Sequence, residues 1–175
     1  MNAERCAARR QDIFVRLFFR FLLCYLLAFA VGYLLAVRGI GLLLREHVAL
    51  ATPLFALLAL AGGFSRISGI YLLLLTMIKA LWEAQLALRI VLLWKTGAIN
   101  ILAANGCLLA LCFSLILSLT AAALARRFAF ESYLCDLKLL CSRECTRYLL
   151  KALLLFALGL CSYLLWSHLL NLFPL

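Results

Sequence analysis

The chain has 175 residues, of which 68% are hydrophobic and 14% are charged, and its mean hydropathy is +1.13. A soluble domain is closer to half apolar, so these proportions exclude an ordinary soluble globule and indicate a protein whose solvent is lipid. Lys and Arg number 17 against seven Asp and Glu, giving a net charge of +10. The cations stand beside apolar runs, where they act as topology signals and contact anionic lipids, so we expect no nucleic-acid partner.

We predict an all-α fold, a polytopic transmembrane helical bundle in which residues 1–175 form a single membrane domain. An arginine-bearing amphipathic segment leads into the first span. The second span is entered through Thr52-Pro53, and a proline in the first turn of a helix costs little. The predicted spans, each close to the length that crosses a bilayer, are about 17–37, 48–64, 67–94, 99–125 and 148–170, with a cytoplasmic loop at 126–147.

The third span is unusual in its length and its polar centre. Its 28 residues would extend about 42 Å as a helix, against roughly 30 Å for the hydrocarbon core. Either one long helix tilts and projects from the membrane, or two shorter helices meet in it. We favour one helix because no Gly or Pro lies between residues 71 and 96. The polar centre consists of Lys79, Trp82, Glu83, Gln85 and Arg89.

The distribution of cations predicts the topology. With the N-terminus in the cytoplasm and five spans, twelve of the 17 Lys and Arg residues lie on the cytoplasmic side. Only Arg38, Arg45 and Lys95 lie outside, and Lys79 and Arg89 fall within the third span. Since cytoplasmic loops carry the excess of Lys and Arg, we predict a cell-membrane protein with its N-terminus cytoplasmic and its C-terminus outside.

Lys79 and Glu83 are the main candidate site residues. Four residues apart, they share one helical face and can neutralise each other, and an ionisable residue within a membrane is a candidate for function. With Gln85 and Arg89 they form a polar face of about 160° on a helical wheel. This face could meet a partner, a substrate or a water-filled cavity. Alternatively, Lys79 and Glu83 form an internal ion pair that lets the helix pack in a bundle.

We predict no metal, no cofactor and no enzymatic activity. The fourth span carries a stripe of small residues, Ser114, Ser118 and Ala122, which allows close helix approach. Cysteines within spans behave as small apolar residues. No Cys-x-x-Cys or histidine accompanies the cytoplasmic set Cys135, Asp136, Cys141 and Cys145, and His47 and His168 read as interfacial residues. The common hydrolase and nucleotide-binding motifs are absent from the sequence.

Residues 57–93 resemble the stage II sporulation protein M family of spore-forming bacteria. The resemblance is carried by Leu-Ala-Leu-Ala-Gly-Gly-Phe-Ser at 58–65, by Gly-Ile-Tyr-Leu-Leu-Leu-Leu at 69–75, and by Lys79-Ala80 where the family has a Lys-Gly step. The first outer loop is shorter than that of the family. The resemblance implies a non-enzymatic membrane scaffold that organises peptidoglycan-remodelling partners during engulfment, with Lys79 as the position carried over.

The leading functional prediction is therefore a membrane scaffold or anchor. Its expected partners are the lipid bilayer and other membrane or cell-envelope proteins, with a homo-oligomer as a further possibility. The alternative from a different class is a small permease or the membrane subunit of a transporter, in which Lys79, Glu83 and Arg89 would line a pathway. A membrane-embedded enzyme acting on lipids ranks below both, because paired acidic motifs are missing from the sequence.

Overall fold

The computed structural model describes residues 2–40, 48–65, 67–134 and 143–172, and the side chains within 12–40, 52–65, 67–130 and 145–168. These parts of the chain contain five α-helices and no strand, which confirms the predicted all-α class. All but the second are long and apolar enough to cross a membrane, so the chain is a multi-pass transmembrane protein. The helices are α1 (Asn2–Val37), α2 (Val48–Gly62), α3 (Ser68–Lys95), α4 (Ile101–Leu134) and α5 (Arg143–Leu172).

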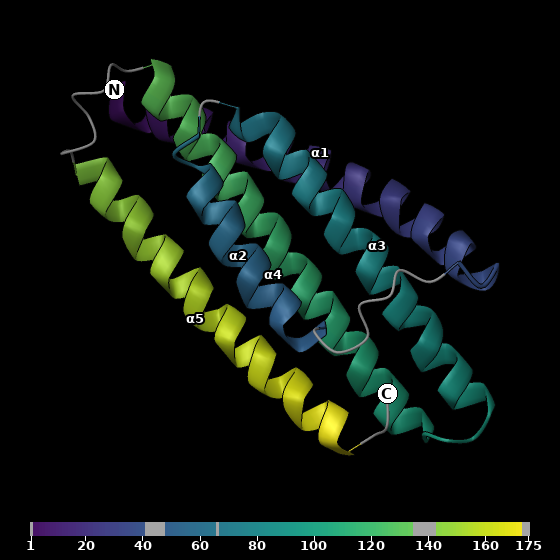
Figure 1. The fold of residues 1–175 in the computed structure, drawn as a ribbon. Coiled ribbons are helices and arrows are strands. Elements are labelled where there is room, and N and C mark those ends of the chain that lie inside the picture. The colour runs from purple at the N-terminus through teal and green to yellow at the C-terminus, as the bar shows by residue number, and fades with distance from the viewer. Residues whose placement is uncertain (1, 41–47, 66, 135–142, 173–175) are drawn as a thin grey trace.

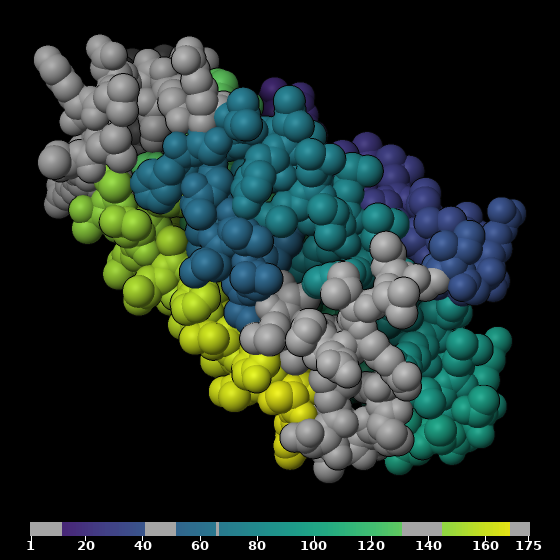
Figure 2. Space-filling model, in the orientation of Figure 1, coloured from purple at the N-terminus to yellow at the C-terminus, as the bar shows by residue number. Residues whose placement is uncertain are grey.

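The helices run alternately in opposite directions through one bundle (Figure 1). α4 is central and packs against the other four, while α1 packs mainly on α3, and α2 packs on both α4 and α5. Figure 2 shows α5, α2 and α3 following one another across one face, with α1 at its edge. The beginning of α1, the end of α4 and the beginning of α5 lie together at one end of the bundle (Figure 1), which we call the basic end. Among the described arginines, it holds Arg16, Arg20, Arg126, Arg127 and Arg147.

The second predicted span needs correction. α2 has 15 residues and is about 22 Å long, short of the roughly 30 Å of a hydrocarbon core. The end of α1 and the start of α3 nevertheless lie at opposite ends of the bundle (Figure 1), so the chain between them still crosses it. Because α2 begins at Val48, Pro53 lies in its second turn rather than its first, where it removes an intrahelical hydrogen bond.

Several other boundaries also differ from prediction. The third predicted span is one unbroken helix, α3, so the two-helix alternative is excluded. The predicted loop at 126–147 is too long at both edges, because residues 126–134 belong to α4 and 143–147 to α5. The lead-in before residue 17 is continuous with α1. A helix can continue past the hydrocarbon core because its backbone groups are paired within the helix, and these segments contain no proline.

Small residues allow the helices around α4 to approach closely. The predicted stripe of Ser114, Ser118 and Ala122 is buried, each residue being at most 1% exposed. Ala125 and Ala129 continue it toward the basic end and are fully buried. Helices in lipid associate through such close van der Waals contact, since there is no hydrophobic drive between them. The stripe therefore brings α4 near enough for Ser114 to reach side chains of α2 and α3.

Candidate functional site: a buried polar network

Lys79 and Glu83 lie in the interior of the bundle. They are 3% and 6% exposed and form an ion pair one turn apart on α3. Their helical spacing of four residues places both side chains on the same face, as the sequence predicted. This face is turned toward α1, α2 and α4 of the same chain, which supply the contacts described next.

Three hydroxyl groups from three other helices complete a network around this ion pair. Tyr25 of α1 donates its phenolic hydrogen to Oε2 of Glu83. Ser114 of α4 lies 2.7 Å from both Oε1 of Glu83 and Nζ of Lys79. Thr52 of α2 lies 2.7 Å from the Ser114 hydroxyl. We call these five side chains, Lys79, Glu83, Tyr25, Ser114 and Thr52, the buried polar network.

The direction of each hydrogen bond follows from the donors available. Ser114 has one hydroxyl hydrogen, which it donates to Glu83. It therefore accepts from Lys79 and from Thr52, which fills both of its lone pairs. The Glu83 carboxylate accepts three hydrogen bonds, two at Oε1 and one at Oε2. Both oxygens are thus occupied by donors from this chain.

An aromatic ring and close backbone packing surround the network. Nζ of Lys79 lies 5.8 Å from the centroid of the Phe55 ring on α2, within the range of a cation–π interaction. On the side of α1, Gly32 packs directly on α3, where an added Cβ would lie 3.0 Å from Cα of Leu81 and 3.1 Å from Cβ of Ala84. The absence of a side chain at Gly32 therefore sets the short α1–α3 separation that lets Tyr25 reach Glu83.

The energetics of the network depend on its completeness. A charge in a low-dielectric interior is costly unless it is paired and hydrogen-bonded. Here the ammonium and the carboxylate neutralise each other, both carboxylate oxygens accept hydrogen bonds, and the ammonium donates to Glu83 and Ser114 and faces the Phe55 ring. Removing one charged partner would leave the other buried and uncompensated, which typically costs about 3–5 kcal/mol. The hydrogen bonds from Tyr25, Ser114 and Thr52 form only where α1, α2, α3 and α4 meet, so the network favours that arrangement.

Family models, curated proteins and solved structures give no match to this chain. The resemblance of residues 57–93 to the stage II sporulation protein M family thus stays a prediction. The role of the network is argued below from its own chemistry. That chemistry comprises a carboxylate, an ammonium, a phenol and two hydroxyls in one connected set.

The other predicted members of the polar face lie outside the network as defined. Gln85 and Arg89 are half-buried on α3. Two residues apart on a helix, Glu83 and Gln85 point about 160° away from each other, so they cannot face the same neighbour. The structure thus joins Lys79 to Glu83 and directs Gln85 toward a different side of α3.

Sequence reasoning missed three network members as hydrogen-bonding partners. Ser114 was noted only as one of the small residues in a stripe, and Thr52 only as a helix entry. Tyr25 gave no signal in the sequence, because its contact with Glu83 joins residues 58 positions apart. A hydroxyl within an apolar span, combined with a buried charge elsewhere, is the signal that could have suggested Ser114 and Thr52.

No group of three or more metal-ligating side chains occurs within the described part of the chain. Cys145 is half-buried and His168 is exposed, both on α5. The other residues considered for a metal, Cys135, Asp136, Cys141 and His47, lie outside the described residues.

Proposed function

We propose that this protein is a non-enzymatic multi-pass membrane scaffold that anchors other membrane or cell-envelope proteins. The observation that carries the proposal is the closure of the buried polar network, in which the charged groups of α3 bind Tyr25 of α1 and Ser114 of α4, and Ser114 in turn binds Thr52 of α2. A network of this kind stabilises one arrangement of helices. A scaffold needs one arrangement, because its outer faces must hold partners in fixed positions.

A transporter must instead alternate between two arrangements of its helices around a site near the membrane midplane. Moving α3 away from α1 and α4 would break the bonds from Tyr25 and Ser114 to Glu83 and expose a buried ion pair to lipid or water. The close contact of Gly32 with Leu81 and Ala84 opposes sliding of α1 on α3. These contacts favour the scaffold over the transport alternative.

The partner class and orientation belong to the same proposal. The resemblance of residues 57–93 to the stage II sporulation protein M family supports peptidoglycan-remodelling enzymes or their anchors as partners, in the cell membrane of a sporulating cell. The arginines gathered at the basic end support a cytoplasmic location for that end. With α5 leading away from it, the carboxyl end of the chain is then outside.

The experiment measures whether the protein still captures its partners when a disulfide between α1 and α3 prevents these helices from moving apart. Photoreactive residues replace Leu102 and Leu150, which are 81% and 70% exposed, so that they report on the outer faces. In the same protein, Gly32→Cys with Ala84→Cys places two Cβ atoms 3.1 Å apart, slightly closer than the roughly 3.5–4.5 Å of a disulfide, so the cross-link needs a local shift of a few tenths of an ångström. Membranes are oxidised or kept reduced before irradiation, and the wild type receives the same treatment.

A scaffold is expected to cross-link to the same envelope proteins in the oxidised and the reduced state, because the two states share the same small local shift at residue 32 and differ only in whether α1 is joined to α3. Loss of partner capture on oxidation, with capture retained in the oxidised wild type, would contradict a fixed arrangement. Irradiation products consisting only of lipid adducts at both positions would contradict the scaffold itself.

The transport alternative is favoured by one feature, the continuity of the hydrogen bonds from Tyr25 through Glu83 and Ser114 to Thr52. Ionisable residues connected in this way inside a membrane occur in proton relays. Proton or solute flux in proteoliposomes that Glu83→Gln abolishes would support transport. The scaffold proposal predicts no flux above that of empty liposomes with either protein.

A further inference from the structure

A pocket of about 450 Å³ opens at the basic end, between the beginning of α1 and the end of α4. Pockets that hold small molecules have volumes of about 300–1,000 Å³. Its described lining includes three arginines and one aspartate, which are Arg16, Arg20, Arg126 and Asp12. The formal charge of these four side chains is +2, so the pocket favours an anion.

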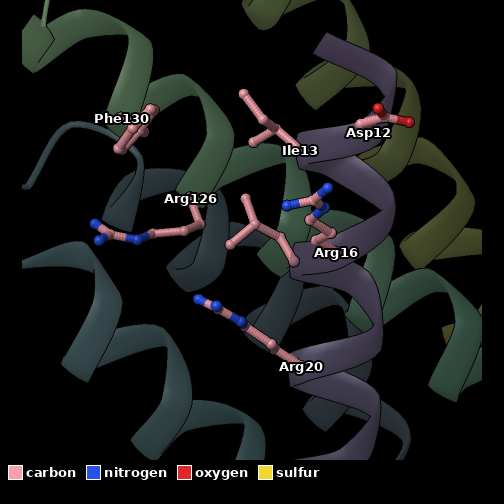
Figure 3. A pocket seen from close by; sticks show the side chains of 7 residues that line it. Asp12, Ile13, Arg16, Arg20, Arg126 and Phe130 are labelled. Carbon is pink, nitrogen blue, oxygen red and sulfur yellow. The ribbon is translucent and has the colours of Figure 1, made fainter. Parts of the chain in front are cut away.

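The pocket presents its guanidinium groups from two helices. Figure 3 shows Arg20 extending from α1 toward the side where α4 carries Arg126 and Phe130, while Arg16 lies along α1 beside it. The Asp12 carboxylate is turned away from the guanidinium groups in this view (Figure 3). Guanidinium groups bind phosphate oxygens with charge-assisted hydrogen bonds in a planar geometry, and several around one pocket suit a phosphate group.

One of the arginines is held in place by α3. Nη1 of Arg126 donates to Oγ of Ser68 over 2.7 Å. At the next position, a Cβ on Gly69 would lie 3.2 Å from Cζ of Arg126, so a glycine there leaves room for the guanidinium group. A guanidinium group has five N–H donors, and the bond to Ser68 uses one of them. Arg126 is thus held at the wall of the pocket by α3, with four N–H donors outside this bond.

The sequence around the pocket is typical of a membrane boundary. Arg16 precedes the apolar run at 17–37, and Arg126 follows the apolar run at 99–125, so these two lining arginines flank apolar runs of α1 and α4. Ile13, Leu17 and Phe130 add an apolar wall beside the arginines. A basic site at the membrane boundary with an apolar wall matches a phosphate attached to a glycerol and acyl chains.

We propose that this pocket binds a phosphate group, supplied either by the headgroup of an anionic phospholipid or by free phosphate. The position of the arginines beside two apolar runs and the apolar wall favour the lipid. The site is independent of the buried polar network, which lies deeper in the bundle on other residues. It therefore gives the protein a specific contact with the leaflet at its basic end, whichever proteins bind its outer faces.

The test uses the full chain purified in a neutral detergent at constant ionic strength. One arm titrates a short-chain phosphatidylglycerol and the other titrates sodium phosphate, and binding is measured by thermophoresis. Arg16→Gln and Arg20→Gln are exposed substitutions, and Arg38→Gln, exposed just after α1 at the opposite end of the bundle, is the matched control. The unfolding temperature of each variant confirms that it is folded.

We expect phosphatidylglycerol to bind the wild type and the Arg38→Gln protein alike, and to bind the Arg16→Gln and Arg20→Gln proteins about tenfold more weakly, since each lost guanidinium removes charge-assisted hydrogen bonds. Binding of phosphatidylglycerol alone identifies the lipid as the source, whereas equally tight binding of sodium phosphate identifies the free anion. Two results would overturn the proposal. One is no binding in either arm, and the other is equal affinity in the Arg16→Gln, Arg20→Gln and Arg38→Gln proteins.

Discussion

Replacing Lys79 with methionine tests the energetic role of the buried polar network. Methionine keeps much of the length and apolar character of the lysine stem but removes the ammonium group. Glu83 then retains two neutral donors, from Tyr25 and Ser114, and has lost its only cation within the network. A buried charge left without its partner typically costs about 3–5 kcal/mol. At about 2–4 °C per kcal/mol for a chain of this size, the unfolding temperature should fall by roughly 6–20 °C.

The assay is thermal unfolding in a neutral detergent, followed by helical circular dichroism. Lys95→Met is the matched control, since Lys95 is an exposed lysine at the end of the same helix, and its effect should stay within about 0.5 kcal/mol. The double variant Lys79→Met with Glu83→Met should be less damaging than the sum of the two single changes, by about 0.5–3 kcal/mol. Equal effects of Lys79→Met and Lys95→Met, or strict additivity in the double variant, would refute the reasoning.

Three further predictions concern packing and topology. Gly32→Leu should lower the free energy of unfolding by about 1–3 kcal/mol, because the added side chain forces α1 away from α3. Gly106 has open space around it, so Gly106→Leu should leave the stability unchanged. Equal losses in the two variants would argue against a close α1–α3 contact. Tyr148→Phe removes a 2.6 Å hydrogen bond to the Leu60 carbonyl and should lower the unfolding temperature by about 2–4 °C. An unchanged unfolding temperature would show that this hydrogen bond does not contribute to stability. A reporter active only outside the cytoplasm should function when fused after Leu175, and an inactive fusion would show an even number of crossings.

The all-α fold class was predictable because the high apolar content of the sequence identifies lipid as the solvent of this protein. A chain this apolar can fold only as helices that satisfy their own backbone in lipid, or as a closed barrel, and its long apolar runs select helices. The limits of α3 came within one residue of prediction because polar and glycine-containing segments flank it. The end of α4 and the beginning of α5 differ from their predicted positions by several residues, because hydropathy marks the edge of the membrane and not the edge of a helix.

The candidate site was predictable only where it is local. The pairing of Lys79 with Glu83 follows from their spacing within one helix. Tyr25 and Thr52 join them through contacts between helices, and the rotation of each helix about its axis depends on the packing of the whole bundle. For the same reason, the sequence showed a polar face on α3 but not which part of it faces inward.

Access of water to the centre of the buried polar network tests the central claim most directly. Ser114→Cys places a thiol of similar size at a position that is 1% exposed, and Lys95→Cys provides an exposed control on α3. Proteoliposomes are treated with a membrane-impermeant cationic thiol reagent from each side in turn, and modification at each position is read by peptide mass. A single closed arrangement predicts modification at residue 95 and none at residue 114 from either side. Modification of Ser114→Cys from one side would show an aqueous path to the network and would contradict the account of a fixed scaffold.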